Sequence, residues 1–537
     1  MLWIYLKSLR CLEETDEAGR DEPYVLVTAV DLDSKLAVPG GTLPVPSSEV
    51  VLYGPYGAVD KGDVRFSSGP SHSFWGVDGT PSELKDPGES IFLVSLLEQD
   101  DGRPSALRTI VKGAAAASIL ATLPLKRPVK LEKLLGDVND AASTPTGAPS
   151  PDERLGTVEL SFTAAELERA RQGKPTGKRV EISGDGGRYE LNFEAVAVGG
   201  IELAPAGSAS LTGGIAAVAR KPENLEIWWI GADGSVEGAF WREKEEWRRY
   251  QLAGAGAAEL QSGIAAVSRT PEALDVWWIG PRGTVKTAVR SEGSVWAFGE
   301  IAGGGEAEPT GGIAAVSRGP DKMDLWWVGA GGSLERAMWT KTTQGQRSRV
   351  AEIGEVALTS AIGAASRRPD VVDVWWIGPD GSVQGASLHD DGAEERYEIA
   401  VGRTASASGG IGGVSRRPDT LDVWWIGVDR SVQGAAGPGK KWRRYRVADP
   451  LIASQSGSIA PTSRKPGTME FWFAGGGGSV EDAFWYDGQA WMEVPLTRGG
   501  AAAEQATMAA VTRLPNTWEM WFVGKDGSIQ DRFWYER

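Results

Sequence analysis

The sequence predicts a mainly β protein whose C-terminal two-thirds is a seven-bladed β-propeller with four-stranded blades. Three observations carry this prediction. A unit of about 49 residues recurs seven times, small turn residues separate its short strand-like segments, and the 537 residues include 71 Gly and 23 Trp. A period of this size without helical periodicity is typical of propeller blades.

The repeats are aligned on a proline in the first turn of each copy. Successive prolines lie 49 residues apart except for one step of 48, at Pro222, Pro271, Pro320, Pro369, Pro418, Pro466 and Pro515. In the first copy the four expected strands are 215–220, 225–231, 234–241 and 247–254. The glycines and prolines between them supply the backbone angles that hairpin turns need.

The seventh copy lacks a fourth strand, because the sequence ends directly after the third one, 529–536. Residues 199–218 match 248–267 of the first copy position for position, although no blade precedes them. We therefore expect residues 198–206 to pair with the C-terminal strand, closing the ring and removing two exposed sheet edges. This places the propeller at 198–537 and leaves an N-terminal domain at 1–197.

Three positions never change their chemical type among the seven copies. Two residues before the proline stands arginine, at Arg220, Arg269, Arg318, Arg367, Arg416, Arg464 and Arg513. Four residues after it stands an acid, at Glu226, Asp275, Asp324, Asp373, Asp422, Glu470 and Glu519. Two residues further stands tryptophan, at Trp228, Trp277, Trp326, Trp375, Trp424, Trp472 and Trp521. We expect the arginine and the acid to lie opposite each other in the hairpin, on the same face as the tryptophan.

Two interpretations of this invariant set remain open. An element that occurs in every copy fits a structural module, with an ion pair that fixes the hairpin and an indole that fills the space between blades. Arginine, carboxylate and indole on one surface are also what a sugar site uses. In the second interpretation Arg220, Glu226, Arg464 and Glu470 are candidate sugar-binding residues.

A second set of aromatic residues varies among the copies. The third strand ends in Trp241, Trp339, Trp485 and Trp534, and the other three copies have Arg290, Leu388 and Gly437 there. The fourth strand begins with Trp247, Trp296 and Trp491 in three copies. Because the blade tolerates glycine at the first of these positions, its tryptophans are candidates for ligand contact, with peripheral packing as the alternative. The copies near 213 and 457 carry both rings.

Composition argues against several functions. The formal net charge of −16 disfavours nucleic acid as a partner. Cys11 is the sole cysteine and the chain has two histidines, His72 and His389, which argues against disulfides and against histidine-based catalysis or metal binding. The start of the chain lacks the basic and apolar regions of a signal peptide. We expect cytoplasmic synthesis, with release by lysis or a dedicated export system if the protein acts outside the cell.

The N-terminal residues 1–197 show no trace of the repeat and predict a β-rich domain, either a sandwich or an α+β fold. Alternating or apolar segments predict strands at 2–12, 24–32, 90–99 and 188–198. A helix is expected over 104–123, and 141–151 is expected to be a loop or short linker.

The repeat resembles the bacterial seven-bladed propeller lectins that bind fucose and O-methylated sugars. The resemblance rests on residues 415–432, SRRPDTLDVWWIGVDRSV, on their relatives in the other copies and on the copy number. It implies a lectin with several weak monosaccharide sites between adjacent blades and fucosylated or O-methylated glycans as partners. The alternative is a scaffold that holds a protein partner within a larger assembly. Sialidases are a rival resemblance, based on the turn at 230–236, but no catalytic cluster interrupts the repeat, so we do not expect an enzyme.

Residues 6–27 resemble the opening of the calcium-dependent membrane-binding sandwich domains, with an acidic loop between two strands. The resemblance implies calcium ligands at Asp16, Asp21, Glu22, Asp100 and Asp101. The alternative is a solvated acidic turn. No other cofactor is expected, and the N-terminal domain would dock, orient or deliver the propeller.

Overall fold

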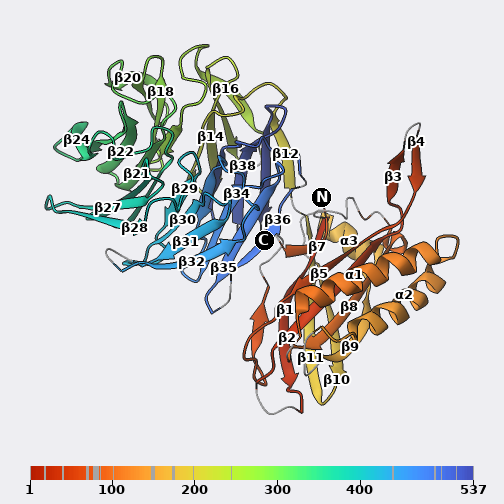
Figure 1. The fold of residues 1–537 in the computed structure, drawn as a ribbon. Coiled ribbons are helices and arrows are strands. Elements are labelled where there is room, and N and C mark those ends of the chain that lie inside the picture. The colour runs from red at the N-terminus through yellow and green to blue at the C-terminus, as the bar shows by residue number, and fades with distance from the viewer. Residues whose placement is uncertain are drawn as a thin grey trace. The chain divides into compact units, whose positions relative to one another are not determined.

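The computed structural model describes most of the chain as two compact units, one that extends to Gly199 and one from Gly200 to Tyr535 (Figure 1). The described residues are 2–16, 20–38, 41–67, 72–76, 84, 86–100, 102–146, 152–171, 176–197, 199–243, 245–437, 441–488, 491–497, 499–515 and 517–535.

The N-terminal unit contains two antiparallel sheets. The first has the order β10-β11-β1-β6, with β7 also paired to β1, and the second has the order β5-β2-β8-β9. The bounds of the first sheet are β1 Leu2–Glu13, β6 Val64–Phe66, β7 Ser73–Trp75, β10 Thr176–Gly184 and β11 Gly187–Ala197. Those of the second are β2 Pro23–Asp31, β5 Ser47–Tyr53, β8 Ser90–Glu98 and β9 Glu153–Leu160, and β3 Lys35–Val38 pairs with β4 Gly41–Pro44.

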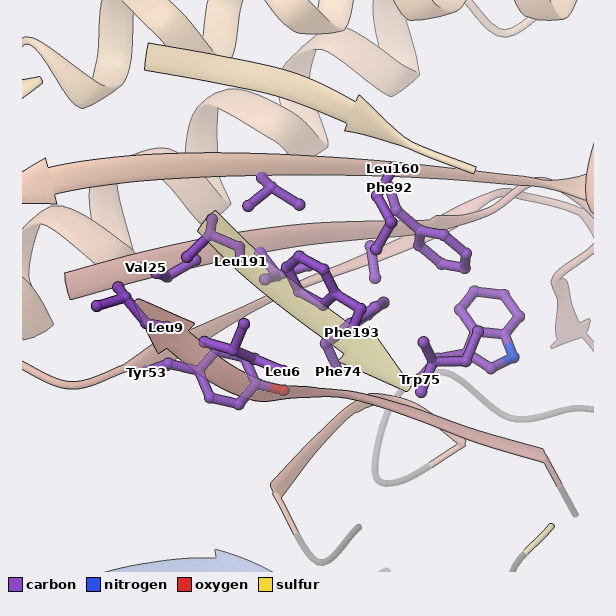
Figure 2. Close-up of a cluster of buried hydrophobic side chains, with 14 of the residues drawn as sticks. Leu6, Leu9, Val25, Tyr53, Phe74, Trp75, Phe92, Leu160, Leu191 and Phe193 are labelled. Atoms are coloured by element: carbon purple, nitrogen blue, oxygen red, sulfur yellow. The ribbon is translucent and has the colours of Figure 1, made fainter. Parts of the chain in front are cut away.

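The main core of this unit lies between the two sheets. Figure 2 shows side chains of β1 and β11, such as Leu6 and Phe193, in one cluster with Val25 and Phe92 from β2 and β8. Strands β2 and β8 are buried along their whole length. Their second face is covered by α1 (Pro104–Ala121) and α2 (Arg127–Ala142), which lie side by side in Figure 1. Burial on both faces explains the nearly continuous apolar sequences of these strands.

The structure confirms the predicted strands of this unit and its first helix, and it corrects the prediction for the following segment. Helix α2 was not predicted, and it extends into the first residues of the expected loop 141–151. The helix buries Leu134, Val138 and Ala141, a helical spacing that its many charged residues obscure in the sequence. A third helix, α3, spans Ala164–Arg171. None of the helices in the described residues is both long and apolar enough to cross a membrane.

In the described residues from Gly199 onward, seven four-stranded antiparallel sheets follow the seven sequence repeats. Sheet 1 consists of β13 Ile215–Lys221, β14 Asn224–Ile230, β15 Val236–Arg242 and β16 Arg248–Ala253. Sheet 2 consists of β17 Ile264–Val267, β18 Ala273–Gly280, β19 Thr284–Ser291 and β20 Ala297–Ala302. Sheet 3 consists of β21 Ile313–Gly319, β22 Lys322–Gly329, β23 Ser333–Trp339 and β24 Gln346–Ala351. Sheet 4 consists of β25 Ile362–Arg368, β26 Val371–Ile377, β27 Val383–His389 and β28 Glu394–Ala400. Sheet 5 consists of β29 Ile411–Val414, β30 Asp422–Ile426, β31 Val432–Ala436 and β32 Arg443–Ala448. Sheet 6 consists of β33 Ile459–Thr462, β34 Thr468–Ala474, β35 Val480–Tyr486 and β36 Met492–Pro495. Sheet 7 consists of β37 Met508–Val511, β38 Thr517–Val523 and β39 Ile529–Tyr535, together with β12 Gly199–Ala204.

The first strands of successive sheets contact one another, and β37 of sheet 7 also contacts β13 of sheet 1. Strand β12, which precedes the first repeat, is hydrogen-bonded to β39 as the fourth strand of sheet 7. The C-terminal strand therefore has a neighbour on each side, in the arrangement that the match between 199–218 and 248–267 predicted.

The second strand of each sheet is buried on both faces. Its invariant tryptophan packs toward the following sheet, and the next large aromatic residue packs toward the preceding one. Trp326 of sheet 3, for example, shares an apolar cluster with Trp376 of sheet 4. The alternation of side chains along a strand thus makes each second strand a source of apolar side chains for two interfaces.

We predict that Phe92→Ala destabilises the N-terminal unit by about 3–5 kcal/mol, because the ring is buried between the sheets and its removal leaves a cavity. Phe66→Ala is the control, since Phe66 is 53% exposed. Its effect should stay within about 0.5 kcal/mol. Calorimetric unfolding of both variants measures the difference, and equal effects would contradict the assignment of the core.

Candidate ligand site between adjacent sheets

All seven arginine and acid pairs of the repeat form ion pairs, with N–O distances from 2.6 to 3.7 Å. Each of the seven acids is at most 2% exposed. The predicted register is wrong by two residues, because the acid lies opposite the residue two positions before the arginine, as Glu226 lies opposite Val218. The arginine reaches the acid from the end of the hairpin through its long side chain.

The invariant residues and the variable tryptophans face different neighbours. Trp241 lies opposite Leu225, whereas Glu226 lies opposite Phe240. Because directly opposed residues share a face and successive residues alternate, Trp241 and Glu226 project from opposite faces of sheet 1. Each ion pair therefore faces the following sheet, and each third-strand tryptophan faces the preceding one.

This geometry determines which residues the variable tryptophans meet. Trp241 meets Arg513 of sheet 7, with the guanidinium carbon 4.7 Å from the ring centroid, and does not meet Arg220 or Glu226. Trp534 meets Arg464 of sheet 6 at 5.3 Å.

The two remaining third-strand tryptophans also face the preceding sheet. Trp485 meets Arg416 of sheet 5, with the guanidinium carbon 4.6 Å from the ring centroid. Trp339 packs against the invariant Trp277 of sheet 2, with ring centroids 5.9 Å apart. A site built from one repeat alone is therefore not formed.

A pocket of about 440 Å³ lies between sheet 7 and sheet 1. We call it the Trp241 pocket, and its lining residues are Ile201, Glu202, Leu203, Trp241, Glu245, Glu246, Trp247, Glu519, Asp531 and Phe533. Trp241 is carried by β15, Trp247 directly precedes β16, and the two buried acids are carried by β38 and β39. The volume lies in the range of small-ligand sites, and the lining combines aromatic faces with hydrogen-bonding groups.

Two buried carboxyl groups dominate the electrostatics of the pocket. Glu519 and Asp531 are 2% and 1% exposed, and Arg513 approaches Glu519 at 3.7 Å, the longest of the seven ion pairs. Burial raises the pKa of Glu519 well above its usual range, Asp531 raises it further, and Arg513 lowers it. Burial also raises the pKa of Asp531, and the charge of Arg532 opposes this shift. Asp531 was not predicted as a site residue. Its signal in the sequence is an acid at a third-strand position where the copies other than the sixth and seventh have Gly, Thr or Arg.

The interface between sheets 6 and 7 has the same kinds of residue. Arg464 pairs with Glu470 at 2.9 Å and lies over Trp534, and Asp482 occupies the position that corresponds to Asp531. The guanidinium also donates a hydrogen bond to the Tyr486 hydroxyl at 3.0 Å.

The interface between sheets 1 and 2 is filled by an arginine. Arg290 stands where the first copy has Trp241, and its guanidinium lies 3.2 Å from the Glu226 carboxylate. The same guanidinium carbon lies 4.8 Å from the centroid of Trp296. The predicted sugar-binding pair Arg220 and Glu226 is therefore closed by a third charged side chain.

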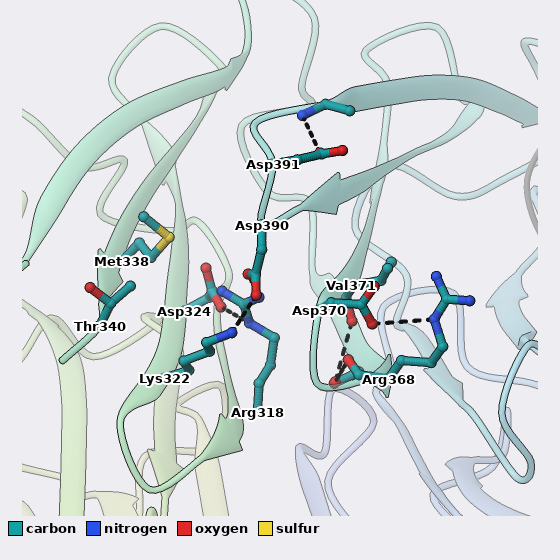
Figure 3. Close-up of polar contacts among 12 residues, drawn as sticks. Arg318, Lys322, Asp324, Met338, Thr340, Arg368, Asp370, Val371, Asp390 and Asp391 are labelled. Carbon is teal, nitrogen blue, oxygen red and sulfur yellow. Dashed lines mark hydrogen bonds and ion pairs between the residues drawn. The ribbon is translucent and has the colours of Figure 1, made fainter. Parts of the chain in front are cut away.

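The interface between sheets 3 and 4 is closed by further ion pairs, as Figure 3 shows. Arg318 binds Asp324 at 2.8 Å and also binds Asp390 of sheet 4, to which Lys322 donates as well. Arg336 supplies a second cation to Asp324, with an Nε–Oδ1 distance of 2.9 Å.

Tyrosines occupy the equivalent space in sheets 1, 4 and 5, where the position of Asp531 is a glycine. A Cβ on Gly238 would lie 2.6 Å from the Tyr250 ring, and Gly385 with Tyr397 and Gly434 with Tyr445 repeat this arrangement.

The tryptophans of the fourth strand are mainly packing residues. Trp491 lies among Trp424, Tyr445 and Phe471, with ring centroids 5.4 to 6.0 Å from its own. Trp442, which the sequence analysis missed because it is displaced by one position, packs on Tyr397 at 5.5 Å. Trp247 packs edge-on against Trp521 at 6.0 Å and also lines the pocket.

The acidic residues proposed as calcium ligands do not form a cluster in the described part of the N-terminal unit. Asp21 is buried and accepts hydrogen bonds from the Thr15 amide at 3.0 Å, the Thr15 hydroxyl at 2.9 Å and the Tyr189 hydroxyl. Asp16 and Glu22 are exposed, Asp100 is half-buried, and Asp101 lies outside the described residues. Within those residues no group of three or more His, Cys, Asp or Glu side chains is placed to hold a metal ion. The calcium site stays a prediction.

The seven repeat sheets define a β-propeller. Its likeness to a solved structure supports this class: the chain superimposes on the BP39L lectin from Burkholderia pseudomallei with a TM-score of 0.57 and 16% identity, over 62% of this chain and 97% of that chain. The six-bladed fucose-recognising lectin of Aleuria aurantia gives a TM-score of 0.41 and 17% identity, over 55% and 98% of the two chains. No protein-family model matches the sequence, and a search of curated proteins finds no match.

We predict that Asp324→Ala destabilises the propeller by about 3–5 kcal/mol, because the change removes the buried carboxylate that pairs with both Arg318 and Arg336. Glu352→Ala is the control, since it removes an exposed partner of Arg349 at 3.3 Å and should leave the unfolding midpoint unchanged. Thermal and denaturant unfolding measure both effects. A small loss for Asp324→Ala would show that the invariant ion pair is dispensable for the fold.

Proposed function

We propose that the protein is a carbohydrate-binding lectin that binds sugars between neighbouring blades of a seven-bladed ring. The observation that carries this proposal is the Trp241 pocket, where an indole, a buried arginine and two buried carboxyl groups meet between sheets 7 and 1. In this proposal the seven sheets are the blades, and β12 closes the ring beside β39.

The chemistry of the pocket suits a sugar. Carboxyl oxygens accept hydrogen bonds from hydroxyl groups, and an aromatic face packs against the apolar C–H face of a pyranose ring. Glu519 and Asp531 are held in place by their strands, so little conformational entropy is lost when they bind a ligand. The BP39L lectin, whose fold this unit shares, is itself named as a lectin.

The number of sites follows from the same comparison of interfaces. The interface between sheets 6 and 7 repeats the arginine, glutamate, aspartate and tryptophan set, and we propose it as a second site. The interfaces between sheets 1 and 2 and between sheets 3 and 4 are filled by Arg290 and by Asp390 with Arg336, and we expect no sugar there. A small number of weak sites would favour dense glycan surfaces through effective concentration. The resemblance of the repeat implies fucosylated or O-methylated glycans.

The N-terminal unit is proposed to dock or orient the lectin. Four apolar side chains between the end of α1 and the start of α2 are exposed by 42–59%: Leu120, Leu123, Leu125 and Val129. Exposed apolar residues gathered in one segment favour contact with another surface. If this unit binds calcium as its sequence suggests, a calcium titration of the full chain followed by calorimetry should show heat and a raised unfolding temperature.

We predict that Trp241→Ala lowers the affinity for sugar at the Trp241 pocket by at least about tenfold, because the ring supplies the main apolar surface. Phe298→Ala is the matched control, since Phe298 is an exposed aromatic residue of β20 outside the pocket. A glycan array identifies the ligand, and calorimetry compares the variants.

Recovery of the ligand unchanged after incubation separates binding from hydrolysis by the two carboxyl groups. Absence of binding to any glycan by the full chain would overturn the lectin proposal. Equal loss in both variants would move the site away from Trp241.

A further inference from the structure

We propose that the Trp241 pocket selects a sugar that carries a free, protonated amine over its neutral and N-acetylated counterparts. This inference rests on the proposed function and names the class of ligand for the same pocket. It follows from the balance of charges in the pocket and from what occupies the equivalent position in a neighbouring interface.

The lining of the pocket is strongly acidic. Of its ten lining residues among those described, five are acidic and none is basic: Glu202, Glu245, Glu246, Glu519 and Asp531. Arg513, which follows β37, stacks on Trp241 and pairs with Glu519. Arg532 of β39 interacts electrostatically with Asp531. The guanidinium of Arg532 lies over Phe522 on the opposite face of the sheet, so it does not face the cavity that the five carboxyl groups line.

In the interface between sheets 1 and 2, a cation takes the place that Trp241 has in the pocket, next to the equivalent buried acid. Glu226 corresponds to Glu519 and Trp296 corresponds to Trp247 in the repeat. Between them lies the guanidinium of Arg290, 3.2 Å from the carboxylate and 4.8 Å from the ring centroid of Trp296. The protein's own side chain thus places a positive charge between a buried acid and an indole, an arrangement that also favours an ammonium group.

Within the described residues, Glu519 lacks the second cation that its counterparts have in two other interfaces. Glu226 pairs with Arg220 and Arg290, and Asp324 pairs with Arg318 and Arg336. In the part of the chain that the structure describes, Glu519 forms its ion pair with Arg513, and it has a second acid, Asp531, as its neighbour.

Three buried oxygens of the pocket can accept further hydrogen bonds. They are one oxygen of Glu519 and both oxygens of Asp531, and the Trp521 indole on the adjacent strand is the neighbouring donor to Asp531. An ammonium group carries three N–H donors and one positive charge, so it can satisfy buried acceptors and offset the repulsion between the two acids. A hydroxyl or an N-acetyl group supplies one donor and no charge.

The same arrangement sets the direction of a pH dependence. Glu202, Glu245 and Glu246 line the pocket beside the two buried acids, Arg513 forms an ion pair with Glu519, and the charge of Arg532 acts on Asp531. Burial and mutual repulsion raise the pKa values of Glu519 and Asp531. A cation binds the ionised pair, so its affinity should increase as pH rises through their titration, for as long as the amine itself stays protonated.

The test compares glucosamine and galactosamine with their N-acetyl forms and with glucose and galactose, using calorimetry on the full chain. We expect the free amines to bind at least about tenfold more tightly than either counterpart, as for other charge-assisted hydrogen bonds in a buried site. Asp531→Asn keeps the shape of the side chain and should remove most of this preference. Glu300→Gln is the control, since Glu300 is an exposed acid of sheet 2 paired with Lys286.

Each outcome has a defined meaning. Binding of neutral or N-acetylated sugars with equal or greater affinity than the amines would overturn this inference and leave the lectin proposal standing. No binding of any sugar would overturn both. A preference for amines that survives Asp531→Asn, and Glu519→Gln as a second variant, would place the selectivity outside this pocket and would also overturn the inference.

Discussion

The propeller depends on one buried interaction, the ion pair between the arginine and the acid of each repeat. A carboxylate at most 2% exposed is tolerated only where a positive charge and hydrogen-bond donors replace water. The arginine supplies the positive charge from the end of the hairpin in all seven sheets, and in sheets 1 to 5 it also donates a hydrogen bond to the acid. The pair therefore fixes the first two strands of each sheet, and the invariant tryptophan beside it fills the interface to the next sheet.

The alternation of side chains along the strands decides what this interaction can be used for. The ion pair faces the following sheet and the third-strand tryptophan faces the preceding one. An ion pair and a third-strand tryptophan that meet therefore belong to two successive repeats. Changes in one repeat alone cannot make a site. In the second repeat, for example, Arg290 stands at the position of Trp241. Its guanidinium binds Glu226 of the first repeat and so closes the interface between sheets 1 and 2.

Much of this could be predicted from the sequence. The repeat length, the position of the turns and the match between 199–218 and 248–267 led to the seven sheets and to the pairing of β12, because these features are local and recur. The invariant ion pair was also predictable, although its register was not, since a long arginine side chain can reach an acid that is not directly opposite. The sequence did not show that Trp241 and Glu226 project from opposite faces of their sheet. Counting positions along strands β14 and β15 would have placed them on opposite faces, but only once the register across the turn was known. Helix α2 was missed because its apolar residues lie among many charged ones.

The interfaces differ in how they balance the same buried acid, and this difference is where function can arise. Between sheets 1 and 2 and between sheets 3 and 4, further cations neutralise the carboxylate and fill the interface. Between sheets 4 and 5, Ser387 donates a hydrogen bond of 2.5 Å to Asp373, and Tyr397 fills the space above Gly385.

Between sheets 7 and 1 neither solution is used: a second acid is added, no tyrosine fills the space, and a pocket remains. An unbalanced buried charge is costly for folding, and a repeat protein can bear that cost in one interface because the other interfaces hold their neighbouring sheets independently. The interface that keeps an unbalanced pair of buried acids and a pocket is thus the one best suited to receive a ligand of opposite charge.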